Sequence, residues 1–241
     1  MQNMTAEPKK VLFARKAGVP ELGYWLDFTP DNPEAIHDFC GPHEIRGAQC
    51  PYCAKPLLRL LSLNSSDPRL GFDAAKVHTI HLLYCWTCSI PYGEFAYRIL
   101  PDDGIEILQI PPIYRYAFGV DGPYESYTGN FPHQRVALMP LSEKEHTQLQ
   151  AAAISHTEPE MELATPRHQV GGYPFILNPS VINCPSCSHE IPLLAAICDD
   201  ATGNGTDDLA PEHTFTGNFG TQMIFHFCRD CSVVMAYHSN D

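Results

Sequence analysis

Eight of the ten cysteines form four Cys-x-x-Cys pairs, and these are the side chains whose type and spacing best suit metal chemistry. Two thiolates separated by two residues can occupy two corners of a tetrahedral zinc site, and a second pair completes the site with Zn–S bonds of about 2.3 Å. The first two pairs are separated along the chain much as the last two are. The sequence therefore predicts two zinc ions per chain, one bound by Cys50, Cys53, Cys85 and Cys88, the other by Cys184, Cys187, Cys228 and Cys231. Exchange of pairs between the two sites stays open.

The same cysteines could instead form disulfides in an oxidising compartment or act as redox dithiols. Residues 1–10 are polar and lack the apolar core of a signal peptide, and no apolar run approaches the roughly 18 residues of a membrane span. We therefore expect a cytoplasmic protein without a membrane partner. In the reducing cytoplasm, regularly spaced Cys-x-x-Cys pairs favour metal binding over disulfide formation. The single cysteines Cys40 and Cys198 are expected to be small buried side chains.

The order of patterns around the pairs indicates two related halves. In each half a Cys-Pro-x-Cys turn precedes a Leu-rich run, and a second strand-like run then ends in the next pair. A short apolar run containing Ala-Tyr follows, at Tyr97 in one half and Tyr237 in the other. We predict a first repeat with a four-cysteine zinc site at 1–100, a central segment at 101–166, and a second repeat with a four-cysteine zinc site at 167–241. The three together are expected to form one compact unit.

The predicted fold is mainly β, of the α+β class, with two zinc-ribbon-like halves joined by aromatic-rich strands and one helix. Aromatic and β-branched residues favour strands on both sides of each turn. Ser142 and Glu145 form a capping box that begins a helix through Ile154. A shorter helix is predicted from Pro33 to Phe39. The Gly171-Gly172-Tyr173-Pro174 motif indicates a structural corner.

The net charge of −13 lies entirely in the second part of the chain. Residues 1–100 contain ten basic and ten acidic side chains, whereas residues 101–241 contain five basic and eighteen acidic ones. Nucleic-acid binding needs Lys and Arg to neutralise phosphates, so this balance argues against a nucleic-acid partner and favours a basic protein. The expected contact residues are four carboxylates of one acidic loop: Asp199, Asp200, Asp207 and Asp208. The residue order of this loop differs from that of a calcium-binding loop.

A resemblance to a known family rests on the order Gly-Gly-x-Pro, Cys-Pro-x-Cys, a Leu-Leu strand, an acidic loop and a Phe-x-Cys-x-x-Cys strand. In these motifs the stretch from His168 to Tyr237 resembles the YwqG-like proteins, which are related to the C-terminal domain of programmed cell death protein 2 and its yeast ribosome-assembly homologue. A weaker version covers Lys16 to Tyr97. The resemblance implies a non-enzymatic protein-binding function, as a chaperone of a ribosomal protein or as a toxin-neutralising immunity protein.

Two other functions remain as alternatives. A hydrolytic enzyme would need an open metal position or a nucleophile motif, but four thiolates close a zinc shell and no Gly-x-Ser-x-Gly, His-Glu-x-x-His or Walker motif occurs. A structural or assembly subunit could use the aromatic side chains of the central segment as its interface: Tyr114, Tyr116, Phe118, Tyr124, Tyr127 and Phe131. The sequence leaves the oligomeric state undetermined.

Overall fold

The computed structural model describes residues 22–72, 76–85, 95–110, 132–155, 167–174, 176, 181–198 and 222–239. Within these ranges it contains eleven strands and one helix. The strands of the first part are β1 (Tyr24–Asp27), β2 (His37–Phe39), β3 (Leu58–Asn64), β4 (Thr79–Tyr84), β5 (Phe95–Ile99), β6 (Ile105–Gln109) and β7 (Gln134–Pro140). Then follow α1 (Glu143–Ser155), β8 (Gln169–Val170), β9 (Leu193–Cys198), β10 (Gln222–Cys228) and β11 (Val233–Ser239).

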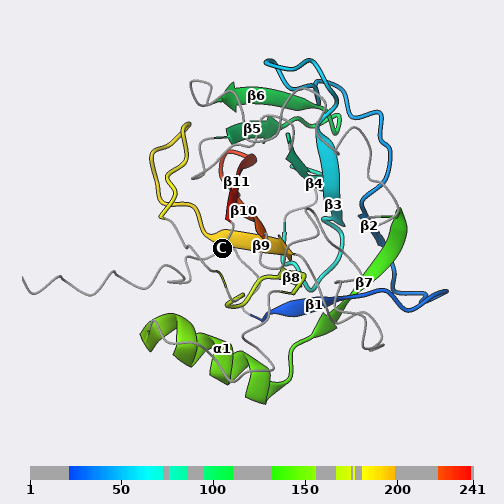
Figure 1. Cartoon of the computed structure of the whole chain (residues 1–241), viewed down its shortest axis with the longest axis vertical. Coiled ribbons are helices and arrows are strands. Elements are labelled where there is room, and N and C mark those ends of the chain that lie inside the picture. The colour runs from blue at the N-terminus through cyan, green and yellow to red at the C-terminus, as the bar shows by residue number, and fades with distance from the viewer. Residues whose placement is uncertain are drawn as a thin grey trace, which may run out of the picture.

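All eleven strands belong to one antiparallel sheet with the order β4-β3-β2-β7-β1-β8-β9-β10-β11-β5-β6. The sheet therefore includes strands from all three predicted segments. It curls around a central space, and β4 at one end of the order lies against β11 near the other end (Figure 1). The mainly β fold class predicted from the sequence is confirmed.

The inside of the curl is the main hydrophobic core. Phe39, Leu61, Leu82 and Phe225 have no exposed surface, and they come from β2, β3, β4 and β10. The residues of β9 and β10 are buried along their whole length, as expected of strands covered on both faces. Since hydrophobic burial is the main source of folding free energy, this shared core joins the first and last parts of the chain into one packed unit.

Two side chains, those of Tyr97 and Asp103, form hydrogen bonds with backbone groups on the outer edge of β4. Tyr97 of β5 is fully buried, and its hydroxyl accepts a hydrogen bond from the Leu83 backbone N–H and donates one to the His81 carbonyl, both at 2.7 Å. Asp103 accepts a bond from the Thr79 N–H at 3.3 Å on the same strand. Exposed strand edges can pair with other chains, and these side chains satisfy backbone groups that would otherwise be open to such pairing.

The predicted capping box is present at the start of α1. The Ser142 N–H donates to Glu145 Oε2 at 2.7 Å, and the Glu145 N–H donates to Ser142 Oγ at 3.2 Å. Trp25 Nε1 also donates to Glu145, and Trp25 packs with Leu149 and Tyr173 in a separate small core under the helix. Among the described residues no helix has the length and apolar character needed to cross a membrane.

The helix predicted from Pro33 to Phe39 is wrong. The segment forms a turn in which Asn32 Oδ1 accepts the Glu34 N–H at 2.9 Å, and the chain then enters β2 at His37. Residues of β2 pair with both β3 and β7, so pairing on two sides outweighs the local signals for a helix. Local capping residues therefore stabilise a turn here instead of a helix.

The glycine corner predicted at Gly171-Gly172 is present. Both glycines have positive φ, 66° and 61°, and a Cβ on Gly172 would come within 2.7 Å of the Gly23 Cα. Only glycine fits such a close approach of two backbones in this conformation. The corner directs β8 between β1 and β9.

One buried contact recurs in both halves. His37 Nδ1 accepts the Asn64 backbone N–H at 3.0 Å, and His168 Nδ1 accepts the Cys198 N–H at 3.1 Å. In each case the histidine lies at or next to a short strand, and the donor is the last residue of the neighbouring strand. Descent of both halves from one repeated unit stays a prediction.

Candidate metal centres

The first Cys-x-x-Cys pair lies on a tight turn that directs two thiols to the same side. The Cys50 N–H donates to the Lys55 carbonyl at 2.9 Å, and the Ala54 N–H donates to the Cys50 carbonyl at 2.8 Å. Ala54 has a positive φ of 55°, which closes the turn, and a bridge between Gln49 and Pro56 joins its two arms. The turn leads directly into β3.

The pair before β9 adopts the same conformation. The Cys184 N–H donates to the His189 carbonyl and the Ser188 N–H to the Cys184 carbonyl, both at 2.8 Å. Ser188 has a positive φ of 60°. The Ser186 N–H points at the Cys184 sulfur at 3.4 Å, which is the orientation that stabilises a thiolate. The local sequence thus builds two equivalent turns at different places in the sheet.

The remaining thiols of the described clusters lie at the ends of β4 and β10 and in the turn after β10. Cys85 directly follows β4, Cys228 is the last residue of β10, and Cys231 lies in the turn to β11. Ser232 closes that turn with a φ of 53°. Strand pairing places these ends beside the first turns, because β3 pairs with β4 and β9 with β10.

Seven thiols fall into two clusters, with the grouping predicted from the sequence. The sulfur atoms of each cluster all lie within 4.8 Å of one another, and the clusters contain Cys184, Cys187, Cys228 and Cys231, and Cys50, Cys53 and Cys85. Cys88, the fourth predicted ligand of the first cluster, lies outside the described residues. Both clusters could hold a metal ion.

The sulfur spacing fits a tetrahedral metal site. Cys187 and Cys228 have their sulfurs 3.8 Å apart, and Cys53 and Cys85 have theirs 3.6 Å apart. Tetrahedral coordination with Zn–S bonds of about 2.3 Å requires a sulfur-to-sulfur distance of about 3.8 Å. A disulfide would instead need about 2.05 Å between the sulfurs. None of the cysteines in the described ranges forms a disulfide.

Burial and hydrogen bonding act on these thiols in opposite directions. The pKa of Cys187 is lowered, chiefly by the hydrogen bond from the His189 backbone. Burial raises the pKa of Cys228 well above its usual range. A cluster with buried thiols gains its thiolates only when a cation compensates their charge, and metal binding then releases protons. The donor set therefore fits a thiophilic metal ion.

The two single cysteines have the predicted structural character. Cys40 and Cys198 have no exposed surface, and burial raises the pKa of the Cys40 thiol well above its usual value. The Gln222 amide donates to the Cys198 sulfur at 3.6 Å. Neither residue belongs to a described thiol cluster.

The predicted acidic contact residues cannot be placed, because they lie outside the described residues: Asp199, Asp200, Asp207 and Asp208. The aromatic side chains of the central segment, from Tyr114 to Phe131, also lie outside the described residues. The proposed contacts of both groups stay predictions.

Two polar clusters were not anticipated from the sequence. His37 Nε2 donates to Asp67 at 2.9 Å in a fully buried pair, and Arg69 binds Asp67 and the exposed Glu34. Burial lowers the pKa of His37. Burial alone would raise the pKa of Asp67, but the hydrogen bonds from Arg69 outweigh it and the pKa is lowered. No motif connects His37 with Asp67, so only the fold shows their proximity.

The second unanticipated cluster has the residue types of a nucleophile and a base. Ser62 Oγ and His81 Nδ1 are 2.9 Å apart across the β3–β4 pair. Both side chains are buried, and burial lowers the pKa of His81 to about 4. This pair therefore lies in the protein interior, away from solvent.

The two thiol clusters could each bind a metal ion, which would link the turns and strand ends that supply the thiols. The complete cluster has four sulfur donors, which is the number a tetrahedral ion takes. Comparisons with family models, curated proteins and solved structures found no match, so the functional argument rests on this arrangement of residues.

Proposed function

We propose that this chain is a non-enzymatic, zinc-stabilised protein-binding module of the cytoplasm that engages a basic protein partner through its acidic C-terminal half. Its role would be that of a chaperone or an immunity protein, as the resemblance to YwqG-like proteins implies. The observation that supports the proposal most directly is the cluster of four thiols with a sulfur spacing of 3.8 Å.

Zinc is the proposed ion because its chemistry fits the donors. It prefers tetrahedral coordination, and soft thiolate ligands select it over magnesium or calcium. Four protein thiolates leave no coordination position for water or substrate, which is the arrangement of structural sites. In the first cluster the proposal assigns Cys88 as the fourth ligand, beside Cys50, Cys53 and Cys85.

The burial of one Ser–His pair supports the non-enzymatic part of the proposal. The Ser62–His81 pair is buried at the β3–β4 pairing, where a substrate would have no access. A base with a pKa of about 4 is also poorly matched to proton abstraction at neutral pH. The pair therefore suits a structural hydrogen bond.

The proposed partner follows from charge. Residues 101–241 contain eighteen acidic and five basic side chains, so their field attracts a protein rich in Lys and Arg. Such a partner could be a nucleic-acid-binding protein before its assembly, or a basic toxin. The acidic loop supplies the proposed contacts, at Asp199, Asp200, Asp207 and Asp208.

Metal analysis tests the zinc sites. We expect two zinc ions per chain in the purified protein and one in Cys187→Ser, because a cluster with three thiolates binds far more weakly. Cys198→Ser is the matched control, since it removes a buried thiol outside the clusters and should retain both ions. Purified protein without a stoichiometric metal ion would refute the zinc sites.

Pull-down from the native host tests the partner. The bound fraction should contain a basic protein that is lost when the four loop aspartates are changed to Asn. A variant with Asp102→Asn and Glu106→Gln removes two exposed carboxylates elsewhere and should retain the partner. Equal binding by all three proteins would contradict the acidic-surface mechanism.

A further inference from the structure

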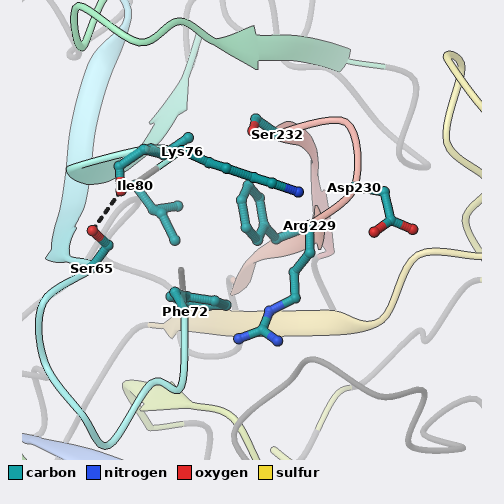
Figure 2. A pocket seen from close by; sticks show the side chains of 9 residues that line it. Ser65, Phe72, Lys76, Ile80, Arg229, Asp230 and Ser232 are labelled. Carbon is teal, nitrogen blue, oxygen red and sulfur yellow. Dashed lines mark hydrogen bonds between the residues drawn. The ribbon is translucent and has the colours of Figure 1, made fainter. Parts of the chain in front are cut away.

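A small pocket lies where the two halves of the sheet meet. Its cavity of about 170 Å³ is bounded by the loop after β3, by the start of β4, and by the end of β10 with the turn to β11 (Figure 2). Cys228 at the end of β10 and Cys231 in the β10–β11 turn lie in the same segment. The pocket wall and the second metal cluster therefore share one short segment.

One wall of the pocket is apolar, and Ser65 and Ser232 also line the cavity. Val77, Ile80 and Phe227 are buried and line it, together with the half-buried Phe72. The rings of Phe72 and Phe227 meet edge to face with centroids 5.4 Å apart, so both are held by packing. Such walls favour an apolar group, because its transfer from water is worth about 25 cal/mol per Å².

The charged residues that line the pocket are two cations, Lys76 and Arg229, and one carboxylate, Asp230. The Arg229 guanidinium lies 4.8 Å from the Phe72 ring centroid and donates to the Gly71 carbonyl, so it is fixed beside the opening. Lys76 is exposed, and in Figure 2 its side chain extends across the pocket from the opposite side. In the same view Asp230 holds its carboxylate away from Phe72.

This charge differs in sign from the chain as a whole, which has a net charge of −13. Two cations and one carboxylate leave a net positive charge at this pocket, which favours a negative group. The field of the acidic remainder would oppose a negative ligand at long range, but salt screens it beyond about 8 Å at physiological ionic strength. Close contact with Lys76 and Arg229 can therefore dominate.

We propose that this pocket binds an acidic peptide, inserting one apolar side chain between Phe72, Ile80 and Phe227 while a neighbouring carboxylate meets Lys76 and Arg229. The cavity is smaller than the roughly 300–1,000 Å³ of typical small-molecule sites, which favours a single side chain over a cofactor. This inference is independent of the proposed function, since it concerns a ligand of opposite charge that contacts other residues.

Titration of the isotope-labelled, metal-loaded full chain with the peptide Ac-Gly-Glu-Glu-Phe-Glu-Glu-Gly-NH₂ tests the proposal by NMR. We expect chemical-shift changes centred on the amides of Phe72, Lys76, Ile80 and Arg229. Replacing Phe in the peptide by Ala, or its four Glu by Lys, should weaken binding at least about fivefold. Phenylacetate at the same concentration should bind more weakly than the Glu-Phe peptide.

Two charge-reversal variants test whether Lys76 contributes to peptide binding. Lys76→Glu should weaken the Glu-Phe peptide at least about fivefold, whereas Lys144→Glu, an equal charge change on the exposed face of α1, should leave its affinity unchanged. Absence of shifts at millimolar peptide, equal affinity for the Lys peptide, or equal effects of the two variants would overturn the proposal. Tighter binding of phenylacetate would assign the pocket to small organic acids and refute the peptide.

Discussion

Three buried histidines couple the stability of this protein to pH. Burial lowers the pKa of His81 and of His226 to about 4 each, and it also lowers the pKa of His37. His226 Nδ1 lies 3.0 Å from the Ile191 carbonyl, which can only accept, so this nitrogen carries the proton of a neutral ring. All three histidines are therefore neutral in the folded protein near pH 7.

Replacing one of these histidines gives a prediction with a defined sign. The unfolded chain protonates His81 near pH 6.5 and the folded chain only near pH 4, so stability falls as the pH drops from 6.5 towards 4. Between pH 7.5 and 5 this residue alone should account for a loss of about 2 kcal/mol. His81→Gln should reduce the pH dependence of urea unfolding by that amount. His78→Gln, an exposed neighbour, should leave it unchanged, and equal slopes in both variants would contradict the assignment.

Single residues also show where sequence reasoning succeeds. The thiol pairs could be predicted because two residues between the cysteines fix their geometry locally, through a turn that Ala54 or Ser188 closes. The pocket residues could not, because Phe72 and Arg229 are brought together only by the curl of the sheet. No spacing rule connects positions so far apart in the chain.

At the level of elements, strands were easier to predict than short helices. The runs at β3, β4, β9 and β10 were expected from their composition, and the capping box located α1. The segment from Pro33 to Phe39 has helix start and stop signals but forms a turn followed by β2, because the pairing of β2 with β3 and β7 depends on distant residues. Local signals decide an element only where no such pairing competes.

The capping box offers a test of a local stabilising contact. Ser142→Ala removes the hydroxyl that accepts the Glu145 N–H, and it should lower the free energy of unfolding by about 1 kcal/mol. Thr147→Ala in the exposed middle of α1 should be neutral or slightly stabilising, because Ala is the better helix former. Chemical denaturation measures both variants. A neutral Ser142→Ala would show that α1 depends on its packing against Trp25 alone.

The covered edge of β4 gives a prediction for the sheet. Tyr97→Phe removes the hydroxyl that binds the Leu83 N–H and the His81 carbonyl, leaving two buried backbone groups without this partner. The expected loss is about 1–3 kcal/mol. Tyr84→Phe removes a hydroxyl bound to the half-buried His238, where water can substitute, and should cost less. Urea unfolding of both variants checks this order, and a larger loss for Tyr84→Phe would reverse it.

At the level of the whole molecule, the two predicted halves are joined at two places. Near the middle of the sheet β1 pairs with both β7 and β8, so a strand from the first segment lies between strands from the other two. Beyond β10, β5 of the first half pairs with β11 of the second. The sequence indicated the similarity of the halves but not this interleaving, because strand order depends on the path of the connections. Because both halves share one sheet, we expect the loss of the metal ion proposed at one cluster to destabilise strands of the other half as well.

Hydrogen exchange tests how far the effect of losing one of the two proposed metal ions extends. Cys187→Ser removes a ligand of the cluster at the end of β10, and exchange should quicken in β9, β10 and β11. Because β4 lies against β11, and Tyr97 of the paired strand β5 binds β4, amides of β3 and β4 should also exchange at least about tenfold faster. Cys198→Ser serves as the control with both clusters intact. Wild-type protection of β3 and β4 in Cys187→Ser would mean that each half is stabilised by its own cluster alone, despite the continuous sheet.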